Sequence, residues 1–155
     1  MKRICLASML VFCFLISFGQ KPNNTPLALN DTISIAYKIS LFDAAEHSVE
    51  KCEIENWIGI CLIDNQQVFG TDWEMPCAKF DYLTLVVNNQ EIALNTSSLY
   101  NPNNCELLLR KDQFQIVPNE GGYLLLGSFS DGAGFYSVEW KIVKSNSIRT
   151  CIKEN

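Results

Sequence analysis

Apolar and polar residues alternate along much of the chain with the two-residue period of a β-strand. In the segment 32–42, Ile33, Ile35, Tyr37, Ile39 and Leu41 are separated by mostly polar residues. Because successive side chains of a strand point to opposite faces, this pattern predicts a strand with one buried face. Further strand-like runs stand at 57–63, 80–87, 91–94, 106–110, 114–117, 123–129, 135–143 and 148–152.

Turn-forming residues separate these runs at short intervals. They are Asp64-Asn65, Asn88-Asn89, Asn101-Pro102-Asn103-Asn104, Pro118-Asn119-Glu120-Gly121-Gly122, Asp131-Gly132-Ala133-Gly134 and Ser145-Asn146-Ser147. The acid-rich segment 43–55 has no strand period, and we expect a loop or a short exposed helix there. Short strands with frequent turns predict an all-β fold: a single antiparallel sandwich or open barrel of about eight to nine strands, with a C-terminal meander.

The stretch 127–140, GSFSDGAGFYSVEW, offers two interpretations, a ligand-holding loop or a hairpin turn. A phosphate cradle needs a helix after its glycines, and a calcium loop needs more regularly spaced oxygen ligands. The following residues alternate as a strand, with Tyr136, Val138, Trp140 and Ile142 on one face. We therefore interpret Asp131–Gly134 as a hairpin loop of three to five residues, in which Gly132 and Gly134 take positive φ angles and Asp131 bonds its own turn.

The first residues have the layout of a secretory signal peptide. Lys2 and Arg3 precede an apolar run from Ile4 to Phe18, which ends at Gly19. The run of about 15 residues is shorter than the roughly 20 that span a bilayer, and its cysteines do not match a lipid-attachment site. We predict a signal peptide at 1–19, a flexible segment at 20–31 and one β domain at 32–155, in a periplasmic or secreted protein that is not a lipoprotein and has no membrane association after cleavage.

Charge narrows the class of partner. Cleavage after residue 19 would remove two of the 12 cationic residues and none of the 17 acidic ones. Nucleic acid is therefore excluded as a partner, because phosphate binding needs clustered cations. An acidic surface either steers a basic protein partner into place or serves solubility alone.

Five cysteines follow the predicted signal peptide, so at least one thiol is unpaired within the chain. The candidates for disulfides are Cys52, Cys61, Cys77, Cys105 and Cys151, with the pairing left open. Strand parity places Cys151 on the face of Arg149 and Lys153, which favours a bridge there. Cys61, in the apolar run 58–63, could instead be a small buried hydrophobe.

The residues that could carry chemistry are few. His47 is the single histidine, in an acid-rich segment where we expect it to be exposed and without a role. One histidine and no C-x-x-C pair argue against a zinc site, and we expect no metal or cofactor. Nothing marks a nucleophile for a catalytic triad.

The loop 70–77 carries two carboxylates around an indole, Asp72, Trp73 and Glu74. In an extended chain both carboxylates would lie on one side, as an acid and base acting on a glycosidic bond require. The alternative is a structured loop in which Trp73 plugs one end of the sandwich and the acids cap backbone amides. Most other tryptophans and tyrosines, Trp57 included, fall at strand positions and are expected in the core. Tyr100, in the polar loop 97–104, is the exception, so Trp73 and Tyr100 are the candidate binding residues.

Together these patterns predict a periplasmic or secreted, non-catalytic binding protein. Its expected role is to bind or neutralise another protein, as immunity and inhibitor proteins do. The alternatives are a small carbohydrate-binding module, with a polysaccharide as partner, or a carboxylate-dependent hydrolase.

Overall fold

The protein is described by a computed structural model that covers residues 26–54 and 56–154. The predicted signal peptide at 1–19 lies outside the described residues. Within the described residues, no helix is long and apolar enough to cross a membrane.

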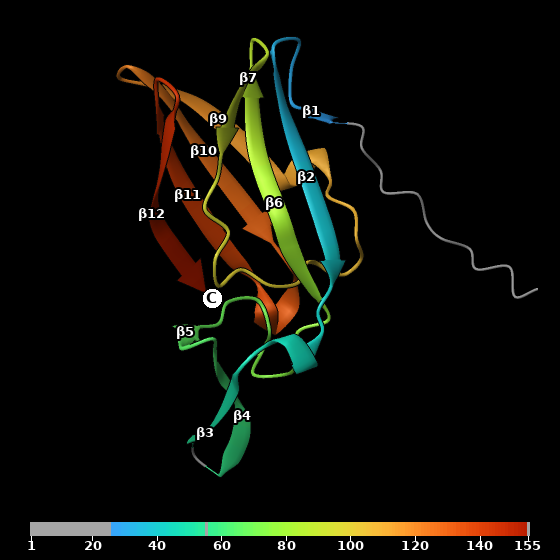
Figure 1. The fold of residues 1–155 in the computed structure, drawn as a ribbon. Helices are drawn as coiled ribbons and strands as arrows, with labels where there is room; N and C mark the ends of the chain where they lie inside the picture. Colours follow the sequence, from blue (N-terminus) through green and yellow to red (C-terminus); the bar gives the residue numbers. More distant parts are fainter. Residues whose placement is uncertain (1–25, 55, 155) are drawn as a thin grey trace, which may run out of the picture.

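Two four-stranded antiparallel sheets pack face to face as a β-sandwich (Figure 1). The first sheet has the order β1 (Leu27–Ala28), β2 (Ile33–Leu41), β6 (Ala78–Val87), β7 (Gln90–Ala93). The second is the predicted C-terminal meander of β9 (Phe114–Asn119), β10 (Gly122–Phe129), β11 (Tyr136–Val143) and β12 (Asn146–Glu154). The all-β prediction is confirmed, and of its two forms the sandwich is the one observed.

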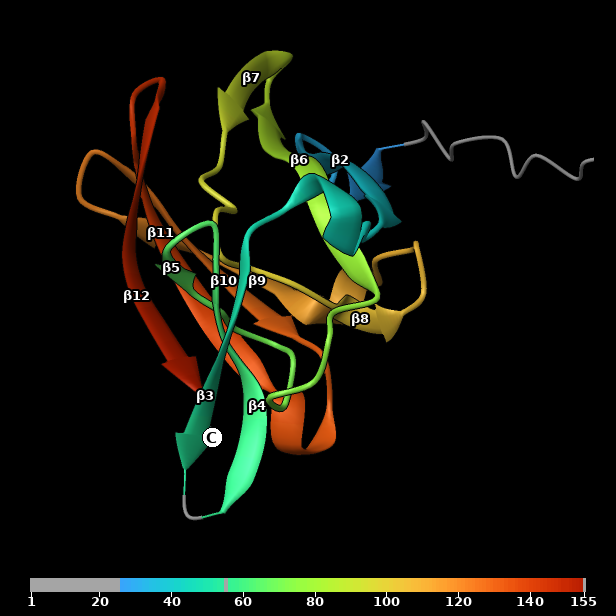
Figure 2. The same cartoon turned by 60° about the horizontal axis from the view of Figure 1, so that its bottom comes forward.

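A third, smaller sheet extends from one end of the sandwich (Figures 1 and 2). It consists of β3 (Val49–Ile54), β4 (Trp57–Ile63) and β5 (Gln66–Gln67). The remaining elements are the short strand β8 (Pro102–Cys105) and the 3₁₀ turns η1 (Ala44–Glu46), η2 (Lys111–Gln113) and η3 (Gly132–Gly134).

The core of the sandwich lies between its two sheets. The inward residues of β11, Tyr136, Val138, Trp140 and Ile142, are all buried, as the alternation predicts. Phe80 from the first sheet meets Phe129 from the second edge to face, with ring centroids 5.6 Å apart. Trp140 donates its indole N–H to the carbonyl oxygen of Asn95 at 3.0 Å, so this buried polar group is paired.

Three sequence predictions of elements are wrong. Residues 49–54, expected in a loop, form β3. Residues 106–110 are not a strand: Leu109 enters the core from irregular chain, and its amide donates a hydrogen bond to the Tyr37 hydroxyl oxygen at 3.2 Å rather than to a neighbouring strand. Part of the segment expected to be flexible is paired instead, since Leu27 and Ala28 lie opposite Ile35 and Ser34 of β2.

The stretch 127–140 is a hairpin, as interpreted, with β10 and β11 joined through η3. Its details differ from the prediction. Positive φ occurs at Ser130 and Gly132 but not at Gly134. The side chain of Asp131 makes no capping hydrogen bond, so its expected role in the turn is wrong.

Candidate binding surface

Exposed apolar side chains concentrate at the end of the molecule that carries the third sheet. Nine large hydrophobic side chains are exposed among the described residues, and five of them fall within 41–75: Leu41, Trp57, Ile58, Trp73 and Met75. Large apolar side chains that remain in water on one region of a small protein mark a contact surface. This end of the molecule is therefore the candidate binding surface.

The hairpin of β3 and β4 is the most prominent part of this end (Figures 1 and 2). Ile54 pairs with Trp57 next to the turn, and Glu53 pairs with Ile58. Trp57 and Ile58 are 65% and 66% exposed, whereas Gly59 and Ile60 are buried. β4 is thus covered from Gly59 onward, whereas its residues between the turn and Gly59 are free. The prediction that Trp57 belongs to the core is wrong.

A disulfide between Cys52 and Cys61 links the two strands of the hairpin. A register shift between Glu50 and Lys51 leaves Cys61 as the extra residue of β4, beside the pair Cys52–Gly59. A cross-link at this point restricts how far the strands can separate. The interpretation of Cys61 as an unpaired buried hydrophobe is wrong.

Trp73 lies against the hairpin in a tight turn. Its backbone oxygen accepts a hydrogen bond from the Ile60 amide at 2.7 Å. A Cβ atom on Gly59 would lie 2.5 Å from the Trp73 Cβ, so the close approach requires glycine at position 59. Trp57 and Gly59 are two residues apart and share a face of the strand. Trp73 therefore lies on the same face of the hairpin as Trp57.

The turn at 71–74 differs from the extended segment expected there. Asp72 and Trp73 have φ angles of 48° and 65°, and the Glu74 amide bonds the Thr71 oxygen. The two carboxylates are thus not spaced along an extended chain. Among the described residues, neither Asp72 nor Glu74 caps a backbone amide, so that expectation is wrong. Both are exposed, and Trp73, at 44% exposure, does not plug the sandwich.

The backbone of Trp73 adopts the left-handed conformation, with a φ angle of 65°. The left-handed region costs a non-glycine residue about 1–3 kcal/mol, and glycine occupies it without that cost. A bulky indole therefore stands in a strained position where it is also partly in water. Strain of this kind is typical of functional sites.

Tyr100 does not present an exposed ring, and its binding role stays a prediction. It is only 8% exposed and packs with Ile60, Ile63 and Val68 in a second apolar cluster. Its loop does lie beside the chain that leads to Trp73, as expected: the amide of Phe69 bonds Ser98, and that of Tyr100 bonds Phe69. The Tyr100 ring therefore belongs to the apolar cluster that anchors β4, and it is not part of the exposed surface. The binding roles of Asp72, Trp73 and Glu74 stay predictions.

His47 links the third sheet to the sandwich. Its ring stacks on Phe42 with centroids 4.7 Å apart, and Nδ1 lies 2.7 Å from a carboxylate oxygen of Asp64. Nε2 lies 3.2 Å from the ammonium of Lys79 on β6. Because an ammonium only donates, Nε2 accepts, and Nδ1 donates its proton to Asp64. The expectation of an exposed histidine without a role is wrong.

This arrangement changes the pKa of Asp64. The hydrogen bond from His47 and a second one from the Ser48 amide lower its pKa. Burial raises the pKa of Tyr100, which faces the same cluster. No exposed nucleophile accompanies His47 in the contacts of the described chain, and its outer nitrogen is occupied by Lys79.

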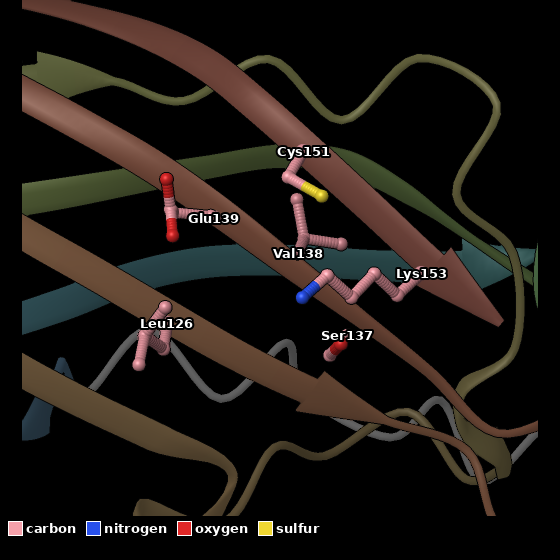
Figure 3. A pocket seen from close by; sticks show the side chains of 6 residues that line it. All are labelled: Leu126, Ser137, Val138, Glu139, Cys151 and Lys153. Carbon is pink, nitrogen blue, oxygen red and sulfur yellow. The ribbon is translucent and has the colours of Figure 1, made fainter. Parts of the chain in front are cut away.

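The second disulfide joins Cys77 to Cys105, and of the five cysteines that the structure describes, Cys151 is the unpaired one. The expectation of a bridge at Cys151 is wrong. A register shift between Glu139 and Trp140 places Cys151 opposite Glu139, on the outer face of the second sheet. There it lines a cavity of about 90 Å³ (Figure 3) with Leu126, Ser137, Val138, Glu139 and Lys153. Pockets for cofactor-sized ligands have volumes of roughly 300–1,000 Å³, so this hollow is too small to hold one.

A wider, shallow groove of about 500 Å³ lies beside the β1–β2 and β6–β7 turns. Its polar lining comes largely from Asn30, Asp31, Asn88 and Asn89. Asn30 is committed to its own turn, where its side-chain oxygen accepts from the Ile33 amide at 2.9 Å. The groove contains no exposed aromatic side chain that would hold a ligand.

No group of three or more metal-binding side chains occurs in the described parts of the chain. Among residues 26–54 and 56–154, the features that point to a ligand are those of the hairpin end. Comparisons with models of protein families, with curated proteins and with solved structures found no match to this chain.

Proposed function

We propose that this is an exported, non-catalytic protein that binds another protein through its hairpin end, as immunity and inhibitor proteins do. The observation that carries the proposal is the exposure of Trp57 and Ile58 on a hairpin cross-linked by Cys52–Cys61. Tryptophan is enriched among the few interface residues that supply most of the binding energy. A cross-linked hairpin holds such a residue in place before binding, which reduces the ordering cost of association.

Charge around the hairpin supports a basic partner. Glu50, Glu53, Asp72 and Glu74 are exposed on the hairpin and the Trp73 turn, and Lys51 is the exposed cation among them. Opposite charge on a partner raises the rate of encounter and fixes orientation. A basic protein surface is therefore the proposed complement.

Export to the periplasm or the outside of the cell is part of the proposal. Two disulfides form within the described residues, and such bonds persist in oxidising compartments. The basic and apolar residues at 1–19 supply the signal on which the proposed export depends.

Capture tests the proposal. The purified protein, immobilised through its sandwich, should retain one protein partner from the exported proteins of the source cells. The Trp57→Ala variant should retain much less, and Ile148→Ala, which alters an exposed residue of β12, should retain as much as the parent. Equal retention by all three proteins would contradict a role for the hairpin end.

A carbohydrate-binding module is the second candidate, favoured by one observation. Trp57 and Trp73 are exposed on the same face of the hairpin, and indole rings offer sugars an apolar face for stacking. Retardation on an affinity gel that contains polysaccharide, lost in both Trp57→Ala and Trp73→Ala, would support this candidate against the protein partner.

A further inference from the structure

We infer that the β3–β4 hairpin acts as a wedge, which enters a narrow cleft on its partner rather than lying on a flat surface. This inference rests on the proposed function and specifies the kind of partner. It follows from the geometry of the tip, its rigidity and its charge.

The tip is apolar on both sides. Trp57 and Ile58 are neighbours in β4, and neighbouring side chains of a strand point to opposite faces. Both are about two-thirds exposed. A flat partner surface can cover one face of the hairpin and would leave the other apolar side chain in water. Only walls on both sides of the hairpin can bury Trp57 and Ile58 together.

The length of the wedge is set where the hairpin meets the rest of the protein. Trp73 packs against Gly59 and bonds the Ile60 amide, so the chain from Gly59 onward is already covered. Among the described residues, those free to enter a cleft are the pairs Glu53–Ile58 and Ile54–Trp57, which face each other across the two strands. This is one short, two-stranded ribbon, and it fits a narrow opening.

The base of the wedge is rigid. The Cys52–Cys61 bond joins the strands where the covered part begins, and Ile60 and Ile63 anchor β4 in the second apolar cluster. An element that is already ordered loses little conformational entropy when it enters a cleft.

Charge identifies the walls of the cleft. Glu53 pairs with Ile58 at the tip, and Glu50 lies three residues earlier in β3, farther from the tip. Asp72 and Glu74 stand on the adjoining turn. A cleft rimmed by lysine or arginine complements these carboxylates, whereas a second copy of this acidic end would repel them. The proposed occupant is therefore a basic protein with a cleft, such as an enzyme whose active site the wedge would close.

Affinity measurements with the captured partner test the wedge. Trp57→Ala should raise Kd by about 30-fold or more, and Ile58→Ala, on the opposite face, by about tenfold. Ile148→Ala is the matched control, since Ile148 is 62% exposed on the sandwich, and it should change Kd less than about twofold. Because all three side chains are exposed, the variants should keep the parent's melting temperature.

Cross-linking tests the two walls directly. A photoreactive benzoylphenylalanine at position 57 in one variant and at position 58 in another should each capture the partner. The two sets of cross-links should map to facing walls of one cleft. Attachment to a single continuous face, or from only one of the two positions, would overturn the wedge.

The outcomes separate the wedge from the proposed function. If Trp73→Ala and Met75→Ala weaken binding while Trp57→Ala and Ile58→Ala do not, the wedge is wrong and the hairpin end still binds. If no variant at this end alters binding, or no partner is captured, both proposals fail. If no protein is captured but the polysaccharide gel retards the protein, and Trp57→Ala and Trp73→Ala abolish this retardation, the ligand is a polysaccharide and the wedge is wrong as well.

Discussion

The sandwich and the hairpin unit β3–β5 solve the same problem, how to hold strands together, by different means. Of the residues that the structure describes, seventeen buried ones form the sandwich core, and four, Ile60, Ile63, Val68 and Tyr100, form the second cluster. The hairpin compensates with a covalent link between its strands. Trp57 and Ile58, near the turn of the hairpin, are exposed, whereas the sandwich fully buries its largest core side chains, Trp140, Tyr136 and Phe129. One region is built for stability, and the other presents side chains outward.

The most direct test of this difference between the sandwich and the hairpin is to truncate one tryptophan in each region. Trp140→Ala removes a fully buried indole and should lower the free energy of unfolding by about 3–5 kcal/mol. Trp57→Ala should change it by about 0.5 kcal/mol or less, because the side chain is exposed. Urea unfolding measures both values. Similar losses from the two variants would mean that the tip is part of the folded core.

Removing each disulfide in turn probes how local the cross-links are. Cys52→Ala with Cys61→Ala opens a link across nine residues of sequence separation, and Cys77→Ala with Cys105→Ala one across 28. Loop-closure entropy predicts losses of roughly 3 and 4 kcal/mol.

Amide exchange distinguishes where each loss falls. Without Cys52–Cys61, protection should fall in β3 and β4 and persist in β10 and β11. Without Cys77–Cys105, protection should fall in β6, which begins next to Cys77. A general loss of protection in the first variant would show that the hairpin and the sandwich unfold together.

Gly59→Ala tests the contact that places Trp73. The new methyl group would lie 2.5 Å from the Trp73 Cβ, so the turn must move away and its bond to Ile60 weakens. We expect a loss of about 1–3 kcal/mol, as for overpacking in a core, together with a change in tryptophan fluorescence. In a Trp73→Gly background, which removes the clashing Cβ, the same substitution should cost less. An equal cost in both backgrounds would show that the Trp73 side chain is not the cause, and would leave the Trp73 backbone oxygen, 2.9 Å from the new methyl group, or the strand itself as the source.

Acid should weaken the contact that His47 and Asp64 make between the third sheet and the sandwich. The expected loss of stability is the smallest of those predicted here. The folded-state pKa of Asp64 is lowered, so its stabilising contribution is present above the unfolded value of about 3.9 and is lost as pH falls through the folded value. The Asp64→Asn variant should therefore lose less stability between pH 5 and 2 than the parent does. Unfolding curves across this range, with Asp131→Asn as the control, measure the difference. If the parent and the Asp64→Asn variant lose the same stability as the pH falls, Asp64 does not stabilise the contact between the third sheet and the sandwich.

The sandwich was predictable where strands obey simple alternation. β2 and β11 each bury one face, so their apolar residues recur at every second position. β3 escaped prediction because a projecting two-stranded ribbon leaves charged residues such as Glu50, Lys51 and Glu53 exposed, so no buried face shapes its sequence. In β4 nearly every residue is apolar, and alternation could not show that Trp57 faces water.

The errors at the cysteines have different physical causes. Cys52–Cys61 and Cys151 all stand next to shifts in strand register, after Glu50 in one sheet and after Glu139 in the other. The extra residue in β4 brings Cys61 beside the Cys52–Gly59 pair, and no local pattern in the sequence reports such a bulge. Cys151 does lie on the outer face with Lys153, as parity predicts, but the residue opposite it is Glu139, which cannot form a bridge. Cys77–Cys105 depends on the meeting of distant segments, which local sequence does not report. The Trp73 turn could be selected from its composition, but its contact with Gly59 could not.

The two apolar clusters share no residue, and this separation makes the hairpin an exchangeable part. Substitutions between Cys52 and Gly59 change neither the seventeen residues that fold the sandwich nor the four that seat the hairpin. The residues at the tip can therefore be replaced while the residues of both apolar clusters are kept. The same scaffold, with its cross-link kept and its turn replaced, is a starting point for binders of other shapes.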